Sequence, residues 1–544
     1  MSRTHDLPRR ALPILAGVLC ALVFADYLYT AWTWLTWNMR SGFAQDAWMQ
    51  YALSIREGSS VAVGNDHPLY PAVLSLWVSR APAAFTLSKL FSFLVGAVTL
   101  AAQFRIGREL FGTRAALIAC ALLSVNWIFL YLSMSIRAEV LLPLFFLMTW
   151  YAVQRGFEGK GAWWLAGGVW AGLTYLTKGT GTLLAIAWAC GLAVPLLGKG
   201  DRRGAGKSPW FLAGFIPLAA ILWWANQRMF GDPFYNFSIR HAMWLDSWWD
   251  LPKHSLDQLS FSGYVASHGW SGVLARLGGG IARFIPVVLS CLSPAKEFPF
   301  AYLLRWPLFL LALAALWTSR KRISGPLRRL EGGAWFTVAL FALFFLLFAW
   351  YHQVSPSERF VGPLNPIVFL LLGAAGARLG EKVMRRLEKL RDGAGYAAAG
   401  AAGVGLILLA SIALKAAEWG IGNPFRADEP PECYRKAYEW VAGRSEPVLY
   451  GPSGDLPIWS LRTHPVFHSV PERPAPESLA AWLDGRGIRA AVVDWDMASL
   501  PFLRGHFENV PERGVRMTRP LPGWRLVLAD AWHDPPHLLI LERR

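Results

Sequence analysis

The chain has 544 residues, of which 54% are hydrophobic and 16% are charged, and its formal net charge is +17. A mean hydropathy of +0.33 and 29 tryptophans exclude an ordinary soluble domain and indicate many membrane spans. The positive charge does not indicate nucleic-acid binding, because lysines and arginines gather in alternate short loops rather than in a basic patch with stacking aromatics.

About eleven segments are predicted to cross the membrane, since a span needs about 20 apolar residues. The first follows Arg9 and Arg10 and is interpreted as a retained span, because its apolar run is longer than the core of a signal peptide. In chain order the predicted spans are residues 11–36, 87–106, 115–134, 140–154, 163–177, 181–197, 210–229, 302–318, 334–351, 362–379 and 396–416.

Basic loops predict how these spans are oriented. Loops rich in lysine and arginine are typical of the cytoplasmic side, and they lie at residues 105–114, 199–207, 320–329 and 378–392. The amino terminus is therefore expected in the cytoplasm, and the long loops 37–86 and 230–301 are expected outside, in a bacterial-type inner or plasma membrane.

The two long outer loops differ in character. The first contains an apolar run at 69–78 that is too short for a span and is expected to lie as a helix in the membrane interface. The second is rich in aromatic residues. These are typical either of a belt at the membrane interface or of a platform that stacks on a sugar or a lipid, and the sequence does not choose between the two.

The composition changes after Trp419, where polar residues and prolines replace the apolar spans. Short apolar runs of strand length follow at residues 447–450, 490–493 and 537–541. Helix-like stretches precede the first two, and this alternation predicts a small α/β domain. We therefore expect an α-helical polytopic membrane domain at 1–420 and an extracytoplasmic α/β domain at 421–544.

Ionisable residues gather at the predicted outer ends of the spans. A charged side chain that faces lipid is costly, so such a set indicates a reaction or transport site. The set consists of Asp46, Asp66, His67, Arg137, Glu139, Lys178, His352, Glu358 and Arg359.

Two carboxylates in this set are candidates for acid–base chemistry. Asp46 has apolar neighbours at helical spacing and could accept a proton from a hydroxyl or amine nucleophile, or it could be an ordinary solvated carboxylate. Glu139 follows Arg137 at the start of a span, where it could cap the helix or turn toward a wet cleft. The two could also share a divalent cation, and the sequence does not decide whether a metal is needed.

Lys178 and His67 are candidates for binding a phosphate. Lys178 lies in the turn 176–181, which exposes backbone amides at the start of the next helix. A cation at an outer turn also runs against the positive-inside bias. His67 opens the segment 67–71 and could add a second phosphate contact, although a lone histidine there is commonly a surface residue.

Five motifs, taken in order, resemble a known enzyme family. They are the Asp46 loop, HPLYP at 67–71, RAE at 137–139, LTKGTG at 176–181 and ERFVGPLNP at 358–366. Together they resemble the GT-C glycosyltransferases, specifically the group of dolichyl-phosphate-mannose protein mannosyltransferases and aminoarabinose lipid A transferases (glycosyltransferase family 39 and relatives). The resemblance covers about residues 10–420.

The resemblance implies an inverting transfer of a sugar from a polyprenyl-phosphate donor to an extracytoplasmic lipid, glycan or protein. It implies that Asp46 serves in catalysis, that Glu139 completes the site with or without a metal, and that Arg359 faces the donor phosphate. Further site candidates are Arg137, Asp66 and Glu358.

This chain departs from the family pattern at two places. It has Gln45-Asp46 where members often have an acidic pair, and His67-Pro68-Leu69 where they have Lys-Pro-Pro. These differences bear on the acceptor and on the phosphate contact.

Two other functions share some of these features. A lipid or solute transporter or flippase would place its charges near the bilayer midplane and would commonly show internal repeats, whereas here the charges lie at helix ends and no repeat is found. A ligase of whole glycan chains, similar to O-antigen ligases, would share the outer site. A pyrophosphate donor would distinguish it from a transferase that uses a monophosphate.

Overall fold

The computed structural model describes most of the helical part of the chain and part of the C-terminal region. The described residues are 7–37, 43–58, 67–79, 82–197, 205–248, 250, 258–292, 332–387, 437, 440, 444, 446–450, 467–468, 479–494, 498, 503, 505–510, 514–529, 536 and 538–544. The predicted spans 302–318 and 396–416 lie outside these residues, so the count of about eleven stays a prediction.

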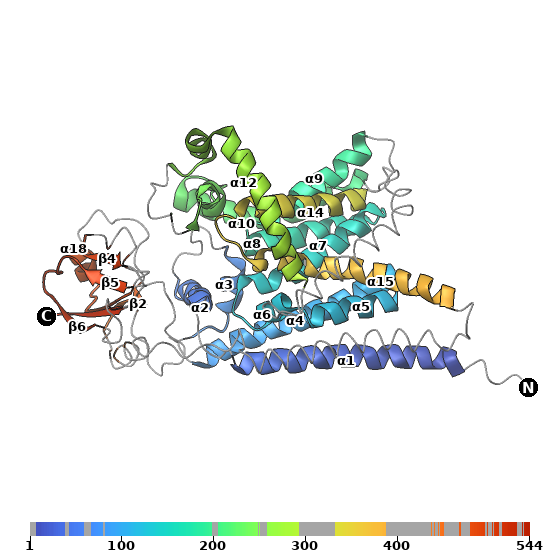
Figure 1. Cartoon of the computed structure of the whole chain (residues 1–544), viewed down its shortest axis with the longest axis horizontal. Coiled ribbons are helices and arrows are strands. Elements are labelled where there is room, and N and C mark those ends of the chain that lie inside the picture. Colours follow the sequence, from blue (N-terminus) through green and yellow to red (C-terminus); the bar gives the residue numbers. More distant parts are fainter. Residues whose placement is uncertain are drawn as a thin grey trace, which may run out of the picture.

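Long helices form a bundle with similar axis directions (Figure 1). They are α1 (Leu7–Trp37), α4 (Pro82–Phe111), α5 (Thr113–Ser124), α7 (Leu141–Phe157), α8 (Gly161–Thr177), α9 (Gly181–Leu197), α10 (Pro209–Phe230), α14 (Gly332–Tyr351) and α15 (Asn365–Leu387). The short helix α6 (Trp127–Ser133) follows α5. Within the described part of the chain, five helices are long and apolar enough to cross a membrane, or six if the bent pair α5–α6 counts as one span.

Local sequence explains where several helices begin and end. Pro209 starts α10, where its missing N–H is not needed, and Gly231 ends it in the left-handed region at φ +69°. At the 69° bend between α5 and α6, the Asn126 side chain accepts a hydrogen bond from the Phe129 N–H at 3.1 Å. This cap starts α6 in its new direction.

Short elements connect the bundle at the end that faces the C-terminal sheet in Figure 1. They are α2 (Phe43–Arg56), α3 (Leu69–Leu74), η1 (Ala138–Val140), α11 (Phe237–Arg240), η3 (Ala242–Trp244), η6 (Glu358–Phe360) and η7 (Gly362–Leu364). The beginning of α1, the turn between α4 and α5 and the end of α15 lie at the opposite end, where the predicted cytoplasmic loops fall. The helix expected within residues 69–78 is found in part, as α3, and its place in the membrane interface stays a prediction.

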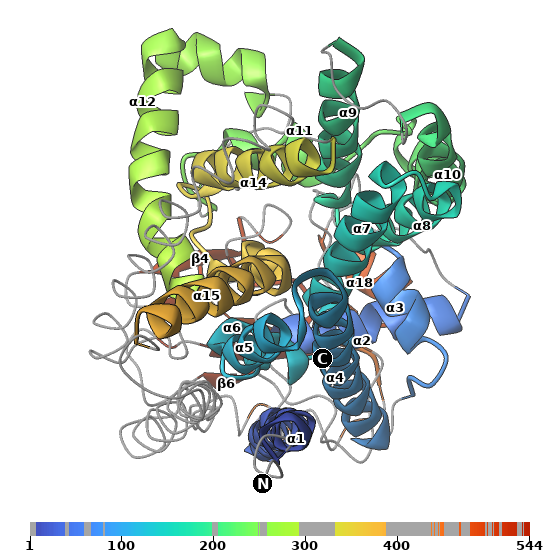
Figure 2. The same ribbon diagram turned by 90° about the vertical axis from the view of Figure 1, so that its right-hand side faces the viewer.

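The loop prediction for residues 230–301 is wrong for Phe261–Cys291, which form the helix α12, kinked at Gly269 (φ +66°). By length and composition α12 qualifies as a span, but its contacts run across the end of α14. The Arg276 guanidinium lies 4.4 Å from the Trp350 ring, the Phe284 ring lies 6.4 Å from His352, and the Ser290 hydroxyl donates to Glu358. Figure 2, which looks along α1, shows α12 as two helical segments that meet at a sharp corner.

The described strands confirm the predicted strands of the C-terminal region. They are β1 (Val448–Tyr450), β2 (Phe467–His468), β3 (Ala490–Asp494), β4 (Phe507–Val510), β5 (Gly514–Met517), β6 (Trp524–Ala529) and β7 (Leu538–Arg543), with the helix α18 (Leu479–Gly485) before β3. One sheet has the order β2-β1-β3-β7-β6, and β4 and β5 pair separately. The pairs β1–β2 and β1–β3 are parallel and the pairs with β7 are antiparallel, so the region combines α and β structure as predicted.

Candidate functional site

An ion pair between Glu139 and Lys178 forms the centre of the candidate site. Glu139 lies in η1, between α6 and α7, and only 5% of it is exposed. Lys178 follows the last residue of α8, and its Nζ lies 2.5 Å from Glu139 Oε1. Burying a carboxylate is costly unless it is paired, so the end of α8 and the start of α7 are held together here.

Two arginines add positive charge to this centre. Arg137 and Arg359 both interact electrostatically with Glu139. Lys178 Nζ lies 5.6 Å from the Phe360 ring and the Arg359 guanidinium lies 5.0 Å from it. Three cations therefore face one carboxylate among the described side chains, which makes the site suitable for an anion.

Several buried nitrogen and oxygen atoms around the pair have no hydrogen-bond partner within the described part of the chain. They are Arg137 Nε, Arg359 Nε, Thr180 Oγ1 and His67 Nδ1. Buried polar atoms are rarely left unpaired, and each such atom calls for an explanation. A ligand with several acceptor oxygens, such as a phosphate, would satisfy donors of this kind.

His67 is a buried neutral group rather than a third cation. Burial lowers the pKa of His67 to about 4; a backbone hydrogen bond with Tyr175 opposes this shift, and the positive charge of Lys178 adds a smaller lowering. The imidazole packs edge-on against the Tyr175 ring, with centroids 5.5 Å apart. At neutral pH it can donate or accept a hydrogen bond but carries no charge.

This buried histidine should make the protein sensitive to acid. The unfolded chain takes up a proton near pH 6.5 and the folded chain only near pH 4, so stability is lost as pH falls through this window. Between pH 7 and pH 5 the buried His67 should lower the free energy of unfolding by about 2 kcal/mol. Denaturation midpoints in detergent at both pH values should move closer together in His67→Gln. An unchanged acid shift in that variant would contradict the buried neutral state.

The structure brings only some of the other predicted residues to this centre. Asp46 lies in α2, but its side chain, like the whole of Asp66, is outside the described residues. The neighbouring Gln45 is buried, and its Oε1 accepts the backbone N–H of Ile136 at 3.0 Å. The start of α2 is therefore attached to the segment that leads into Arg137.

Glu358 and His352 lie toward α12 instead. Glu358 Oε1 accepts a hydrogen bond from the Ser290 hydroxyl at 3.2 Å, and His352 lies against Phe284. Both are close in sequence to Arg359, but their described contacts fix the end of α12 rather than the Glu139–Lys178 pair.

A divalent cation is not favoured by the described residues around Glu139. In the part of the chain that the structure describes, no three His, Cys, Asp or Glu side chains gather in a group. Glu139 is surrounded by cations, which a metal ion would have to displace. Because the Asp46 side chain is not described, the metal stays a prediction, and no chemical step is derived through it.

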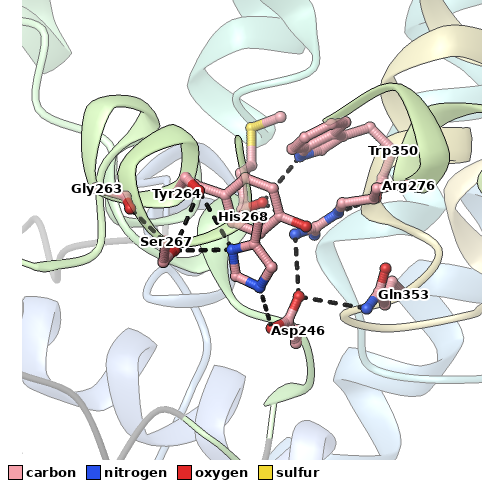
Figure 3. A network of polar contacts seen from close by, with 9 residues as sticks. Asp246, Gly263, Tyr264, Ser267, His268, Arg276, Trp350 and Gln353 are labelled. Carbon is pink, nitrogen blue, oxygen red and sulfur yellow. Dashed lines mark hydrogen bonds and ion pairs between the residues drawn. The ribbon is translucent and has the colours of Figure 1, made fainter. Parts of the chain in front are cut away.

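A second polar network connects α12 to the segment around η3 and to the end of α14 (Figure 3). The sequence did not predict it. Asp246 accepts hydrogen bonds from His268 Nε2 at 3.1 Å and from Gln353 Nε2 at 3.3 Å. The Arg276 guanidinium lies over the rings of Tyr264 and Trp350, at 4.8 and 4.4 Å. Tyr264, one of the aromatic residues of the segment 230–301, therefore has a structural role, because its ring packs against Arg276.

The strength of the central ion pair can be tested by replacing one partner or both. Glu139→Gln should destabilise the protein by about 3 kcal/mol, because it leaves partly buried cations without their carboxylate. The double variant Glu139→Gln/Lys178→Met should recover part of this loss. The control is Glu158→Gln, which breaks the exposed pair with Arg155 and should cost under about 1 kcal/mol. If Glu139→Gln and Glu158→Gln lowered the melting temperature equally, the stabilising role of the buried pair would be contradicted.

Comparison with known proteins identifies the fold. Residues 66–224 match the family model described as dolichyl-phosphate-mannose-protein mannosyltransferase. Among solved structures, ArnT from Cupriavidus metallidurans bound to undecaprenyl phosphate is 14% identical, with 97% of each chain covered and a TM-score of 0.53. The chain has the GT-C fold. An oligosaccharyltransferase from Archaeoglobus fulgidus tethered with an acceptor peptide is 15% identical, with a TM-score of 0.55. The match includes 95% of this chain and 75% of the oligosaccharyltransferase chain.

These findings confirm the predicted fold class and the predicted resemblance to GT-C glycosyltransferases. The matching family is one of glycosyltransferases, which confirms the predicted enzyme class. The match includes His67, Glu139 and Lys178. No curated protein matches the chain. The multi-pass membrane character is confirmed, and the orientation in the membrane stays a prediction.

Proposed function

We propose that this GT-C chain transfers a sugar from a polyprenyl-phosphate donor to an acceptor, at the end of the bundle that holds Glu139 and Lys178. The observation that carries the proposal is the excess of cations and unpartnered buried donors around this pair. A phosphate monoester or diester offers the matching charge and acceptor oxygens. The matching family is named for a polyprenyl-phosphate sugar, and a solved neighbour holds undecaprenyl phosphate.

In this proposal the cations bind the phosphate and stabilise it as it leaves. An acceptor hydroxyl or amine attacks the anomeric carbon, the bond between that carbon and the phosphate oxygen breaks, and the electron pair leaves with the polyprenyl phosphate. Lys178 and Arg359 neutralise the negative charge that grows on this oxygen. Attack from the opposite face inverts the anomeric configuration.

Asp46 is the proposed base. It would take the proton of the acceptor as the new bond forms, a role that contributes about 10²–10⁴ in rate. Glu139 would hold Lys178 in place rather than accept a proton, because its Oε1 is already bonded to the ammonium. The start of α2 is attached beside Arg137 through Gln45, which supports placing Asp46 near the donor.

The site is proposed to face away from the cytoplasm. It lies at the end of the bundle opposite the turn between α4 and α5, which belongs to a basic loop of the cytoplasmic type. The C-terminal α/β region lies at the same end as the site in Figure 1, and we propose that it is a lid or docks the lipid, glycan or protein acceptor.

A binding and transfer experiment would test this function. Purified protein in lipid nanodiscs would be offered undecaprenyl phosphate, undecaprenyl pyrophosphate and inorganic phosphate, and then labelled polyprenyl-phosphate sugars and a labelled polyprenyl-pyrophosphate-linked glycan with extracted envelope acceptors. We expect binding of the monophosphate lipid and transfer from one of the labelled donors. Use of a pyrophosphate-linked glycan alone would favour a ligase, and binding without transfer from any donor would favour a transporter. Either result would contradict the proposal.

A further inference from the structure

Asn236 has its side-chain amide fixed by the helix that it starts. It is the residue before α11, and its Oδ1 accepts the backbone N–H of Ile239 at 3.0 Å. A carbonyl oxygen can accept this bond and an amide nitrogen cannot. The orientation of the amide is therefore determined, and Nδ2 points to the other side.

On that side Nδ2 lies 3.5 Å from His67 Nε2, a long contact between residues 169 positions apart in the sequence. An amide NH₂ group can only donate a hydrogen bond. The facing ring nitrogen must then offer its lone pair, and a neutral imidazole that accepts at Nε2 carries its proton on Nδ1.

Nδ1 of His67 is one of the buried polar atoms without a close hydrogen-bond partner in the described part of the chain, and a backbone hydrogen bond with Tyr175 also acts on the ring. The ring itself is only 4% exposed. Lys178 is the charged group that acts on it. An Nδ1–H in this position is a buried, neutral hydrogen-bond donor on a ring that lies within electrostatic range of Lys178.

Gly179 allows this arrangement. A Cβ at this position would lie 2.9 Å from Asn236 Nδ2 and 3.5 Å from His67 Nε2. The first distance is too short for real atoms, so the amide would have to move. The first glycine of the 176–181 turn thus leaves room for the contact between Asn236 and His67.

We propose that Asn236 is a positioning residue that holds His67 in the tautomer with its proton on Nδ1, so that this N–H is presented to the phosphate of the donor. The part that concerns the phosphate rests on the proposed function. The part that concerns the tautomer stands on the contacts of Asn236 alone. Asn236 itself acts only through His67.

Nuclear magnetic resonance of the wild-type protein tests the tautomer without any activity. The chain has 11 histidines, so the ring nitrogens of His67 would be assigned in ¹⁵N-histidine-labelled protein by comparison with His67→Gln. At pH 7 we expect a protonated Nδ1 and a bare Nε2. A proton on Nε2 would overturn the proposal, whatever the protein transfers.

Asn236→Asp then reverses the direction of one hydrogen bond. The carboxylate can still accept the Ile239 N–H, but it accepts from the imidazole as well, so the proton should move to Nε2. Affinity for undecaprenyl phosphate at pH 8 should fall about tenfold, the effect of one hydrogen bond to a charged group. It should recover toward pH 6, because the new carboxylate favours an imidazolium with protons on both nitrogens.

Matched variants separate this role from a structural one. Asn236→Ser keeps a helix cap but does not reach His67, so it should weaken binding equally at both pH values. Gly179→Ala should resemble it, because it displaces the amide. Asp232→Asn changes a charge in the same loop and should leave binding unchanged. A pH-independent loss in Asn236→Asp would overturn the positioning role. If the proton moves to Nε2 in Asn236→Asp but the lipid affinity stays unchanged, the tautomer assignment holds and the contact between His67 and the phosphate is refuted.

Discussion

Lys178→Met is expected to lower kcat/KM for sugar transfer by about 10²–10³-fold, the usual effect of removing one electrostatic stabiliser of a developing anion. Lys178 is the described cation in direct contact with Glu139. Its loss removes positive charge from the place where the leaving phosphate gains negative charge. The fold should persist, because Arg137 and Arg359 still act on Glu139. Steady-state kinetics with a labelled polyprenyl-phosphate sugar would measure the effect.

Two controls show whether the effect belongs to this site. Lys160→Met removes a lysine that is exposed and lies in the turn before α8, at the other end of that helix, and it should leave transfer unchanged. Lys178→Arg keeps the charge with a different shape and should recover part of the activity. A Lys178→Met enzyme within threefold of the wild type would contradict the role given to this cation.

Asp46→Asn is expected to lower kcat by about 10²–10⁴-fold, because it removes the proposed general base. The affinity for undecaprenyl phosphate should change little, since the phosphate is assigned to Lys178 and Arg359. This separation distinguishes a base from a residue that binds the donor. Single-turnover transfer and lipid binding would be measured on the same preparation.

The matched control for Asp46 is Glu57→Gln, an exposed carboxylate just after α2, which should leave both measurements unchanged. A normal rate for Asp46→Asn would exclude this base. A large loss of lipid affinity in that variant would also count against it, because it would place Asp46 in the phosphate site or in its support.

The sidedness of the site could be predicted from the sequence because it depends on local patterns. Loop charge and helix ends place Glu139 and Lys178 at one end of the bundle, and the fold brings these two into contact although they are 39 positions apart. Motif order added Arg359. These features can be predicted without knowing the tertiary contacts, since span length and loop charge are properties of short segments.

Other features could not be predicted, because they depend on long-range packing. Asn236 looks like an ordinary loop residue until the fold places it beside His67. The crosswise direction of α12 follows from its contacts with the end of α14 and not from its composition, which would also suit a span. The neutral state of His67 comes from burial, which no single segment reveals.

The central claim is that a lipid phosphate binds at the Glu139–Lys178 centre. Cryo-electron microscopy of the full chain in nanodiscs with undecaprenyl phosphate would test it most directly. We expect density for the phosphate within hydrogen-bond distance of Lys178 and Arg359, with the Nδ1 edge of His67 turned toward it. A phosphate bound at the opposite end of the bundle, with this centre filled only by its own side chains, would contradict the account.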